Sequence, residues 1–357
     1  MVALVITHPG LFVDLPIPAR KRVEIPLEFR RKRVQNGRFK IEIELPPVVR
    51  QPLMVSYGMG TDSTALLALL IKMVERGNAD AMPDVIHFAD VRAEKDVTMA
   101  YVDKAQRYLK AAGFPAVTVV SKFGRGTSKD DSIIENCERL KTMPSICFGG
   151  KSCSIKHKAD QMDLWTNKWL PAQQAWAAGL TVLKLIGYDA GKADMRRSTN
   201  PGDEKYTYCY PLRDAGLTRP DLTAIIAAMG WDDPGKSACF MCGATKRHEL
   251  VPLYQTEPDK LARALRLEAA AMRNSIERGM KMTTKGLGRN WAWREYLEVS
   301  NPEIIIALAA RYGIGTKDWL IYKDLMAKRG DLAAGPLTEP EVETCDGAFD
   351  DILAPLP

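Results

Sequence analysis

The stretch MVSYGMGTDSTALLALLIKMVERG, residues 54–77, decides the fold, because an apolar segment meets a helical one there through a glycine-containing turn. Residues 53–57 predict a strand. Residues 64–76 predict a helix that is apolar on nearly all sides, and Gly77 stands at the usual C-terminal cap position. Two interpretations of the turn stay open: an ordinary capped connection, or a site where a helix N-terminus receives an anion.

Further strands and helices alternate after this unit. Strands are expected at 84–90, 116–120 and 181–187, with an amphipathic helix at 97–112. The polar run that follows, 188–212, is expected to be irregular. This alternation predicts an α/β fold with a doubly wound parallel sheet covered on both faces.

Changes of composition divide the chain into four parts. We expect short strands in the N-terminal part at 3–7, 23–29 and 39–45, and amphipathic helices near the C-terminus. The expected parts are an N-terminal β arm (1–50), a nucleotide-binding domain with a cysteine-rich knuckle (51–255), a helical region (256–335) and a loosely held tail (336–357).

The composition is that of a globular protein. The 357 residues carry a formal net charge of +6, contain no run of eighteen apolar residues and show no export signal at the start. We therefore expect a cytoplasmic protein without a membrane partner. Residues 20–33 are strongly basic and 338–351 acidic, which indicates either two solvated faces or a footprint for a polyanion such as nucleic acid.

The turn at 58–63 does not match two familiar phosphate loops. A Walker A loop needs Lys before its last Ser or Thr, whereas Asp62 precedes Ser63 here. The dinucleotide fingerprint expects Gly or Ala where Ser63 stands. A carboxylate within a phosphate turn favours a metal ion nearby, because phosphate alone would repel it.

The sequence Gly58-Met59-Gly60-Thr61-Asp62-Ser63 resembles the Ser-Gly-Gly-x-Asp-Ser loop of the adenine nucleotide α-hydrolase superfamily. This superfamily contains the N-type, or PP-loop, ATP pyrophosphatases and the PAPS reductase-like proteins. HFADVRAEKDVTMAYV at 87–102, LIGYDAGKADMRR at 185–197, YCYPL at 208–212 and PGKSACFMC at 234–242 resemble PAPS reductase-like segments in the same order. The resemblance covers about 50–260, and the loop departs from the pattern at Gly58 and Met59.

The resemblance implies a HUP-like fold that binds ATP and Mg²⁺. Amides of 58–64 and the hydroxyls of Ser63 and Thr64 would hold the β- and γ-phosphates, Asp62 would contact Mg²⁺, and a substrate oxygen would attack the α-phosphorus. The expected nucleotide-binding residues are Ser56, Gly58, Gly60, Thr61, Asp62, Ser63, Thr64, Phe88, Asp90 and Gly187. The expected catalytic residues are Asp62, Lys156, Arg196 and Arg197.

The cysteines suggest a second site. Cys239 and Cys242 form a CxxC pair in a turn-rich knuckle, and Cys153 is the best third ligand. For a fourth ligand, spacing does not choose among Cys147, which we place first, Cys209 and His248. A [4Fe–4S] cluster, a zinc ion and an unligated redox pair all stay open. Cys137 and Cys345 are expected to be bystanders.

The function implied is an ATP-dependent adenylating or sulfur-transferring enzyme. Its substrate would be DNA or RNA, as in DNA phosphorothioation and tRNA thiolation, and a sulfur-donor protein would be a partner. Aromatic residues at 290–297 and 317–322 indicate core packing, a homodimer contact or a base-stacking surface. The alternatives are a sulfonucleotide reductase, although the Glu-Cys-Gly-Leu-His tail of such reductases is missing, and a non-catalytic nucleotide-binding regulatory protein.

Overall fold

A five-stranded parallel sheet forms the centre of the fold. The computed structural model describes residues 11–36, 39–123, 129–150, 152–197, 202–280 and 284–328. The strands of the sheet are β5 (Leu53–Ser56), β6 (Val85–Ala89), β7 (Val117–Val120), β8 (Val182–Ile186) and β9 (Tyr206–Cys209), and their order is β7-β6-β5-β8-β9. The prediction of an α/β fold with a parallel sheet is confirmed. Because the strand order reverses between β5 and β8, a crevice is expected where these two strands end.

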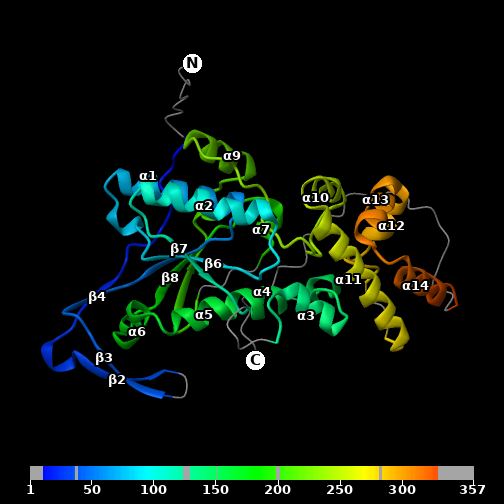
Figure 1. Ribbon diagram of the computed structural model, residues 1–357. Helices are drawn as coiled ribbons and strands as arrows, with labels where there is room; N and C mark the ends of the chain where they lie inside the picture. The colour runs from blue at the N-terminus through cyan, green and yellow to red at the C-terminus, as the bar shows by residue number, and fades with distance from the viewer. Residues whose placement is uncertain are drawn as a thin grey trace.

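Helices cover both faces of this sheet (Figure 1). One face is covered by α1 (Thr61–Glu75), α2 (Asp96–Ala111) and α9 (Arg219–Ala228), and the other by α5 (Asp160–Thr166) and α6 (Leu170–Ala177). The side chains of each strand alternate between the faces. Leu53 and Val55 pack in the core with α1, whereas Met54 packs in the core with α6. All three are fully buried, which explains why the strands read as continuous apolar runs.

The N-terminal part forms two small antiparallel sheets. In one, β1 (Arg22–Glu24) pairs with β4 (Val48–Arg50); in the other, β2 (Arg31–Asn36) pairs with β3 (Phe39–Glu44). Ile43 and Ala175 belong to one small core, so this part packs on α6. The strands β2, which begins in the basic run, and β4 were not expected. The expected strand at 23–29 is wrong at its end, where Leu27–Phe29 forms a 3-10 helix after Pro26, and the expected strand at 3–7 falls outside the described residues.

The expectation that 188–212 is irregular is wrong at its end. Tyr206–Cys209 forms β9, which pairs in parallel with β8 and closes one edge of the sheet. Its four residues are too few to show a period against the polar residues before them. Tyr and Thr nevertheless have high strand propensity, which was the signal available.

The C-terminal helices build a second core. It contains α3 (Ile133–Leu140), α10 (Leu250–Thr256), α11 (Pro258–Glu277), α12 (Trp293–Ser300), α13 (Pro302–Tyr312) and α14 (Thr316–Lys328). Trp293 and Trp319 are buried in it, so the core interpretation of these aromatic residues is confirmed. The knuckle around Phe240 and Met241 packs here as well, and not in the sheet core. The tail 336–357, with Cys345, lies outside the described residues.

Short helices complete the chain: α4 (Ser152–Ser154), α7 (Lys192–Met195) and α8 (Pro211–Asp214). Within the described ranges, the helices all fall short of the length and apolarity that crossing a membrane requires.

Candidate functional site

The glycine turn joins the end of β5 to the start of α1 at the switch point. Gly60 is the N-cap residue, and α1 begins at Thr61, three residues earlier than the sequence indicates. Asp62 and Ser63 therefore lie in the first helical turn, where amide groups have no intrahelical acceptor. Among the described residues, the amides of Met59, Gly60, Asp62 and Ser63 have no hydrogen-bond partner. These free amides are what a phosphate would bind.

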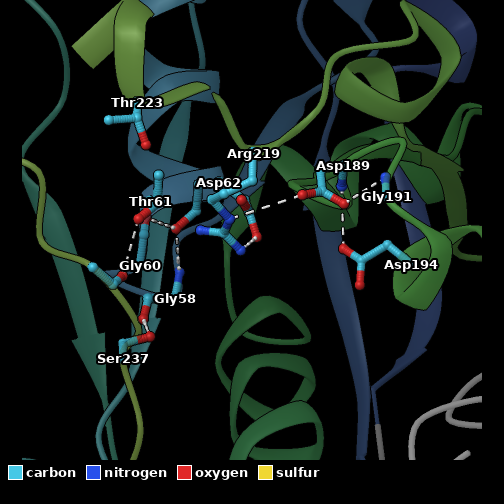
Figure 2. Close-up of polar contacts among 12 residues, drawn as sticks. Gly58, Gly60, Thr61, Asp62, Asp189, Gly191, Asp194, Arg219, Thr223 and Ser237 are labelled. Atoms are coloured by element: carbon cyan, nitrogen blue, oxygen red, sulfur yellow. Dashed lines mark hydrogen bonds and ion pairs between the residues drawn. The ribbon is translucent and has the colours of Figure 1, made fainter. Parts of the chain in front are cut away.

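A remote segment, 233–237, closes one side of the turn (Figure 2). The Thr61 amide donates to the Gly235 carbonyl at 3.0 Å, and the Thr61 hydroxyl donates to Asp233 Oδ1 at 2.6 Å. The Ser237 hydroxyl donates to the Gly58 carbonyl. A Cβ added at Gly60 would lie 3.2 Å from Ser237 Oγ, so glycine permits this close contact. The Thr61 amide and hydroxyl therefore already have hydrogen-bond partners. This makes Thr61 a weaker candidate for binding phosphate than the sequence suggests.

Two more of the expected ligands bond within the turn. The Ser63 hydroxyl accepts from the Gly58 amide and donates to the Gly60 carbonyl, both at 3.2 Å. Thr64 is 1% exposed, and its hydroxyl lies 3.1 Å from that of Tyr57. The expectation that Thr64 offers its hydroxyl to phosphate thus receives no support. The free backbone amides are better candidates.

Met59 occupies an unusual backbone position. Its φ is +60°, in the left-handed region where glycine is the usual residue, and its side chain is 1% exposed. The Met59 side chain packs in the core beside α1. This burial holds the backbone of the turn in a conformation that costs about 1 kcal/mol for a residue with a side chain.

A second turn, after β8, lies against the first. A Cβ added at Gly187 would come within 3.1 Å of both the amide nitrogen and Cα of Ser63. Only glycine lets the two backbones approach so closely. Gly187 therefore serves by bringing the residues that follow it up to the first turn of α1.

The approach of these two turns brings two carboxylates to one arginine and a third carboxylate beside them. Arg219 Nη2 lies 2.9 Å from Asp62 Oδ2, and Arg219 Nε lies 3.9 Å from Asp189 Oδ2. The Asp189 amide donates to Asp194, which pairs with Arg197 at 2.9 Å. Figure 2 shows Arg219 between Asp62 and Asp189.

Burial, together with the charges of Asp189 and Asp194, raises the pKa of Asp62 to about 7, against the lowering effects of Arg219 and Arg197. Asp62 Oδ1 is buried and has no hydrogen-bond partner among the residues that the structure describes. The charge of the Asp62 carboxylate is thus only partly compensated by Arg219, because water screens this half-exposed guanidinium. Carboxylate oxygens such as those of Asp62 are suitable ligands for a hard divalent cation.

Other expected nucleotide-binding residues are less directly placed. The Phe88 side chain is buried in the core with α1 and α2, and Ser56 Oγ is buried without a partner. Asp90 accepts from the Arg92 amide at 2.6 Å. Asp90 also lines a cavity of about 340 Å³ that reaches Lys260 on α11. Asp90 is therefore the one of these three whose side chain borders open space.

The expected cations are spread over two elements. Lys156 is exposed on a π-helical turn, Ile155–Ala159, and its carbonyl accepts from Gln161. Arg197 lies after α7, pairs with Asp194 and stacks 4.5 Å from the centre of the Tyr188 ring. Arg196 is the C-cap residue of the same helix. The cation that reaches Asp62 is Arg219, which sequence reasoning missed because the α9 segment carries no phosphate motif.

The four expected thiol ligands gather beside the second core. The thiols of Cys239 and Cys242 share a hydrogen bond, which lowers the pKa of Cys242 to about 6 and raises that of Cys239. The Cys147 thiol lies beside them, since a Cβ at Gly243 would come within 2.8 Å of it. Cys209, an alternative fourth ligand, lies on β9 in the sheet core. The packing favours Cys147 over Cys209 as a member of this group.

Protein groups satisfy most of these thiols. Cys147 is 1% exposed and donates to the Leu287 carbonyl at 3.4 Å, while Cys153 Sγ lies 3.2 Å from Ser145 Oγ. Over the part of the chain described, three or more His, Cys, Asp or Glu side chains nowhere lie together as a metal site would require. The iron–sulfur and zinc hypotheses stay predictions, and no reaction step below depends on them.

One buried carboxylate faces the thiol pair. Glu94 has a side chain 1% exposed and pairs with Lys158 at 3.4 Å, while its Oε2 is buried without a partner. The charges of both residues act on Cys239. Glu94 and Asp90 line the same cavity. The Glu94 carboxylate is therefore close both to the thiol pair and to the end of β6.

No family model matches the chain, and no curated protein matches it in sequence.

Proposed function

We propose that this chain is a PP-loop enzyme of HUP-like fold that binds Mg²⁺ and ATP at the switch point and cleaves ATP between the α- and β-phosphates. The cleavage adenylates a substrate or supports sulfur transfer to it. The observation that carries the proposal is the turn 57–63, where free amides of a helix N-terminus stand beside a carboxylate with an unpaired oxygen. Free amides occur at any helix N-terminus, but an ordinary capped turn has no use for a buried, unpaired carboxylate oxygen beside them.

Each group then has a chemical role. The amides of Gly60, Asp62 and Ser63 bind oxygens of the β- and γ-phosphates, since a helix N-terminus favours negative charge. Asp62 would hold Mg²⁺ through its unpaired oxygen, and the ion would there supply positive charge to neutralise the leaving pyrophosphate. Arg197, which pairs with Asp194 and stacks on Tyr188, is our candidate for binding the α-phosphate.

The nature of the acceptor rests on charge and on the thiols. Arg31, Lys32 and Arg33 are exposed on β2, a cationic strand that suits the phosphates of DNA or RNA, although Arg33 pairs with Glu42 of β3 at 3.8 Å. The Cys239–Cys242 pair is suited to accept or pass on sulfur from a donor protein. A nucleic acid that receives sulfur is thus the acceptor that accounts for both features.

The test is pyrophosphate release from ATP and Mg²⁺, with and without DNA or RNA. The full chain is compared with Asp62→Asn, which keeps the shape of the side chain, and with Asp103→Asn, an exposed control on α2. We expect release to rise with nucleic acid, to fall about 100-fold in Asp62→Asn and to stay unchanged in the control. ATP binding without turnover would favour a regulatory protein. Sulfite release from PAPS would favour a sulfonucleotide reductase.

A further inference from the structure

We infer that Asp62 and Asp189 together form a divalent-cation site at the switch point, and that Arg219 neutralises this carboxylate pair while the cation is absent. The inference rests on the proposed function and adds two residues to it. Asp189 supplies the second carboxylate, and Arg219 competes with the ion. The metal suited to such oxygen ligands is Mg²⁺ or Mn²⁺.

The backbone brings the two carboxylates together and keeps them there. Asp62 lies in the first turn of α1, and Asp189 follows Gly187 by two residues on the turn after β8. The missing Cβ of Gly187 lets this turn pack against the backbone of Ser63. Because β5 and β8 are hydrogen-bonded neighbours in the sheet, the two turns are held on one rigid support.

One oxygen of each carboxylate remains unused. Asp189 Oδ1 accepts from the Gly191 amide at 2.9 Å, whereas Asp189 Oδ2 makes no hydrogen bond to the described part of the chain and lies 3.9 Å from Arg219 Nε. The Asp189 side chain is 10% exposed. Asp62 Oδ1 is buried without a partner. Buried charged oxygens are costly unless they are paired, and a divalent cation would pair both.

The neighbouring positive charges do not fully compensate the charges of Asp62 and Asp189. Asp194 adds a third carboxylate, and its charge is balanced by Arg197 at 2.9 Å. Arg219 is then the cation that contacts Asp62 and Asp189. One guanidinium thus faces two carboxylates, and an ion of charge two would balance them fully.

The Arg219 side chain is free to move away from the two carboxylates. Arg219 is the first residue of α9, and its side chain is 52% exposed. An exposed ion pair is worth little free energy, so an incoming ion can displace the guanidinium. The released side chain stays close enough to meet a phosphate, for which arginine is well suited. In the free protein, Arg219 keeps the affinity for metal low until the nucleotide arrives with its ion.

The test measures Mn²⁺ binding to the full chain without nucleotide, by the loss of the free Mn²⁺ electron paramagnetic resonance signal. We expect Arg219→Gln to bind Mn²⁺ at least tenfold more tightly than the wild type. The double variant Arg219→Gln with Asp189→Asn should lose this gain. Arg219→Lys keeps the charge and should stay within about threefold of the wild type. Arg273→Gln removes an ion-paired arginine on α11 and should change nothing.

Two results would overturn the inference: equal Mn²⁺ affinity in the wild type and Arg219→Gln, or a gain that survives Asp189→Asn. Near-ultraviolet circular dichroism of each variant separates a lost fold from a lost site. The same measurements distinguish a failure of this inference from a failure of the proposed function. If the wild type binds no ATP yet Arg219→Gln gains Mn²⁺, the cation site stands and the nucleotide proposal fails. If ATP binds and Arg219→Gln gains nothing, the reverse holds.

Discussion

The glycine turn at 58–63 and the thiol group are the two regions where the sequence predicts ligands. They differ in how many of their polar atoms lack a hydrogen-bond partner. The turn keeps free amides and an unpaired Asp62 oxygen. At the thiol group, Cys147 and Cys153 already bond to Leu287 and Ser145. Unpaired buried polar atoms are rare in native proteins. We therefore expect a ligand to need less rearrangement at the turn than at the thiols.

The support of the thiol group offers the largest test of this comparison. Glu268 on α11 is fully buried and accepts from the amides of Leu287, Trp293 and Arg294 at 2.7–2.9 Å. We expect Glu268→Ala to lower the free energy of unfolding by about 3–5 kcal/mol, because three donors lose their acceptor. Urea unfolding followed by circular dichroism measures this. Glu277→Ala, an exposed change on α11, should cost under about 0.5 kcal/mol; an equal cost would contradict the role of Glu268.

The same carboxyl predicts a pH dependence of about 3 kcal/mol. Burial raises the pKa of Glu268 to about 7 from its ordinary value of 4.5. Between these two values the folded state holds the proton and the unfolded state has lost it. Stability should therefore be highest below pH 4.5 with respect to this group, and should fall as the pH rises to about 7. Because Asp62 acts in the same direction, the quantity to measure is the difference in slope between the wild type and Glu268→Gln. Parallel slopes would refute the assignment.

Thiol reactivity distinguishes the members of the thiol group. We expect iodoacetamide at pH 7 to modify Cys242 about 100-fold faster than Cys147 in metal-free protein, since Cys242 is partly exposed with a lowered pKa and Cys147 is buried. Peptide mapping by mass spectrometry reads out both sites in one sample. Equal rates would contradict the prediction, because they would show that Cys147 is as accessible and as reactive as Cys242. In Glu268→Ala, Cys147 should react faster, because Leu287 loses its anchor.

The smallest change tests the turn. Gly187→Ala puts a Cβ 3.1 Å from the Ser63 backbone, and we expect it to cost about 1–2 kcal/mol of stability and about tenfold in ATP affinity. Thermal melting and equilibrium dialysis with ATP give the two values. Gly315→Ala is the matched control, since a Cβ there meets nothing within 4 Å. A Gly187→Ala protein that binds ATP normally would separate the close approach from nucleotide binding.

Local patterns were enough to predict most of the sheet and the turn. The strands at 53–57 and 181–187 and the helix after the turn were visible as apolar runs bounded by glycine. The short strand β9 was missed, because four residues cannot show a period. The thiol pair of Cys239 and Cys242 was equally visible, since both residues lie in one motif.

The partners of the turn could not be predicted, because they come from distant parts of the chain. Arg219 reaches Asp62 across 157 positions, and Asp233, in the segment 233–237, reaches Thr61 across 172. Neither segment carries a motif that refers to phosphate. Contacts of this kind depend on how the helices pack, which no local pattern encodes. The ion pairs at the carboxyl ends of β5 and β8 are thus the part of the site that can be identified only from a structure.

The buried Met59 side chain has a consequence for how quickly the site can work. In glycine-only loops the chain samples many shapes, and a ligand must first select one of them. Here a hydrophobic anchor holds the left-handed residue in place before any ligand arrives. Little conformational entropy is then lost on binding, so association should be limited by diffusion and by release of the arginine, and not by folding of the loop.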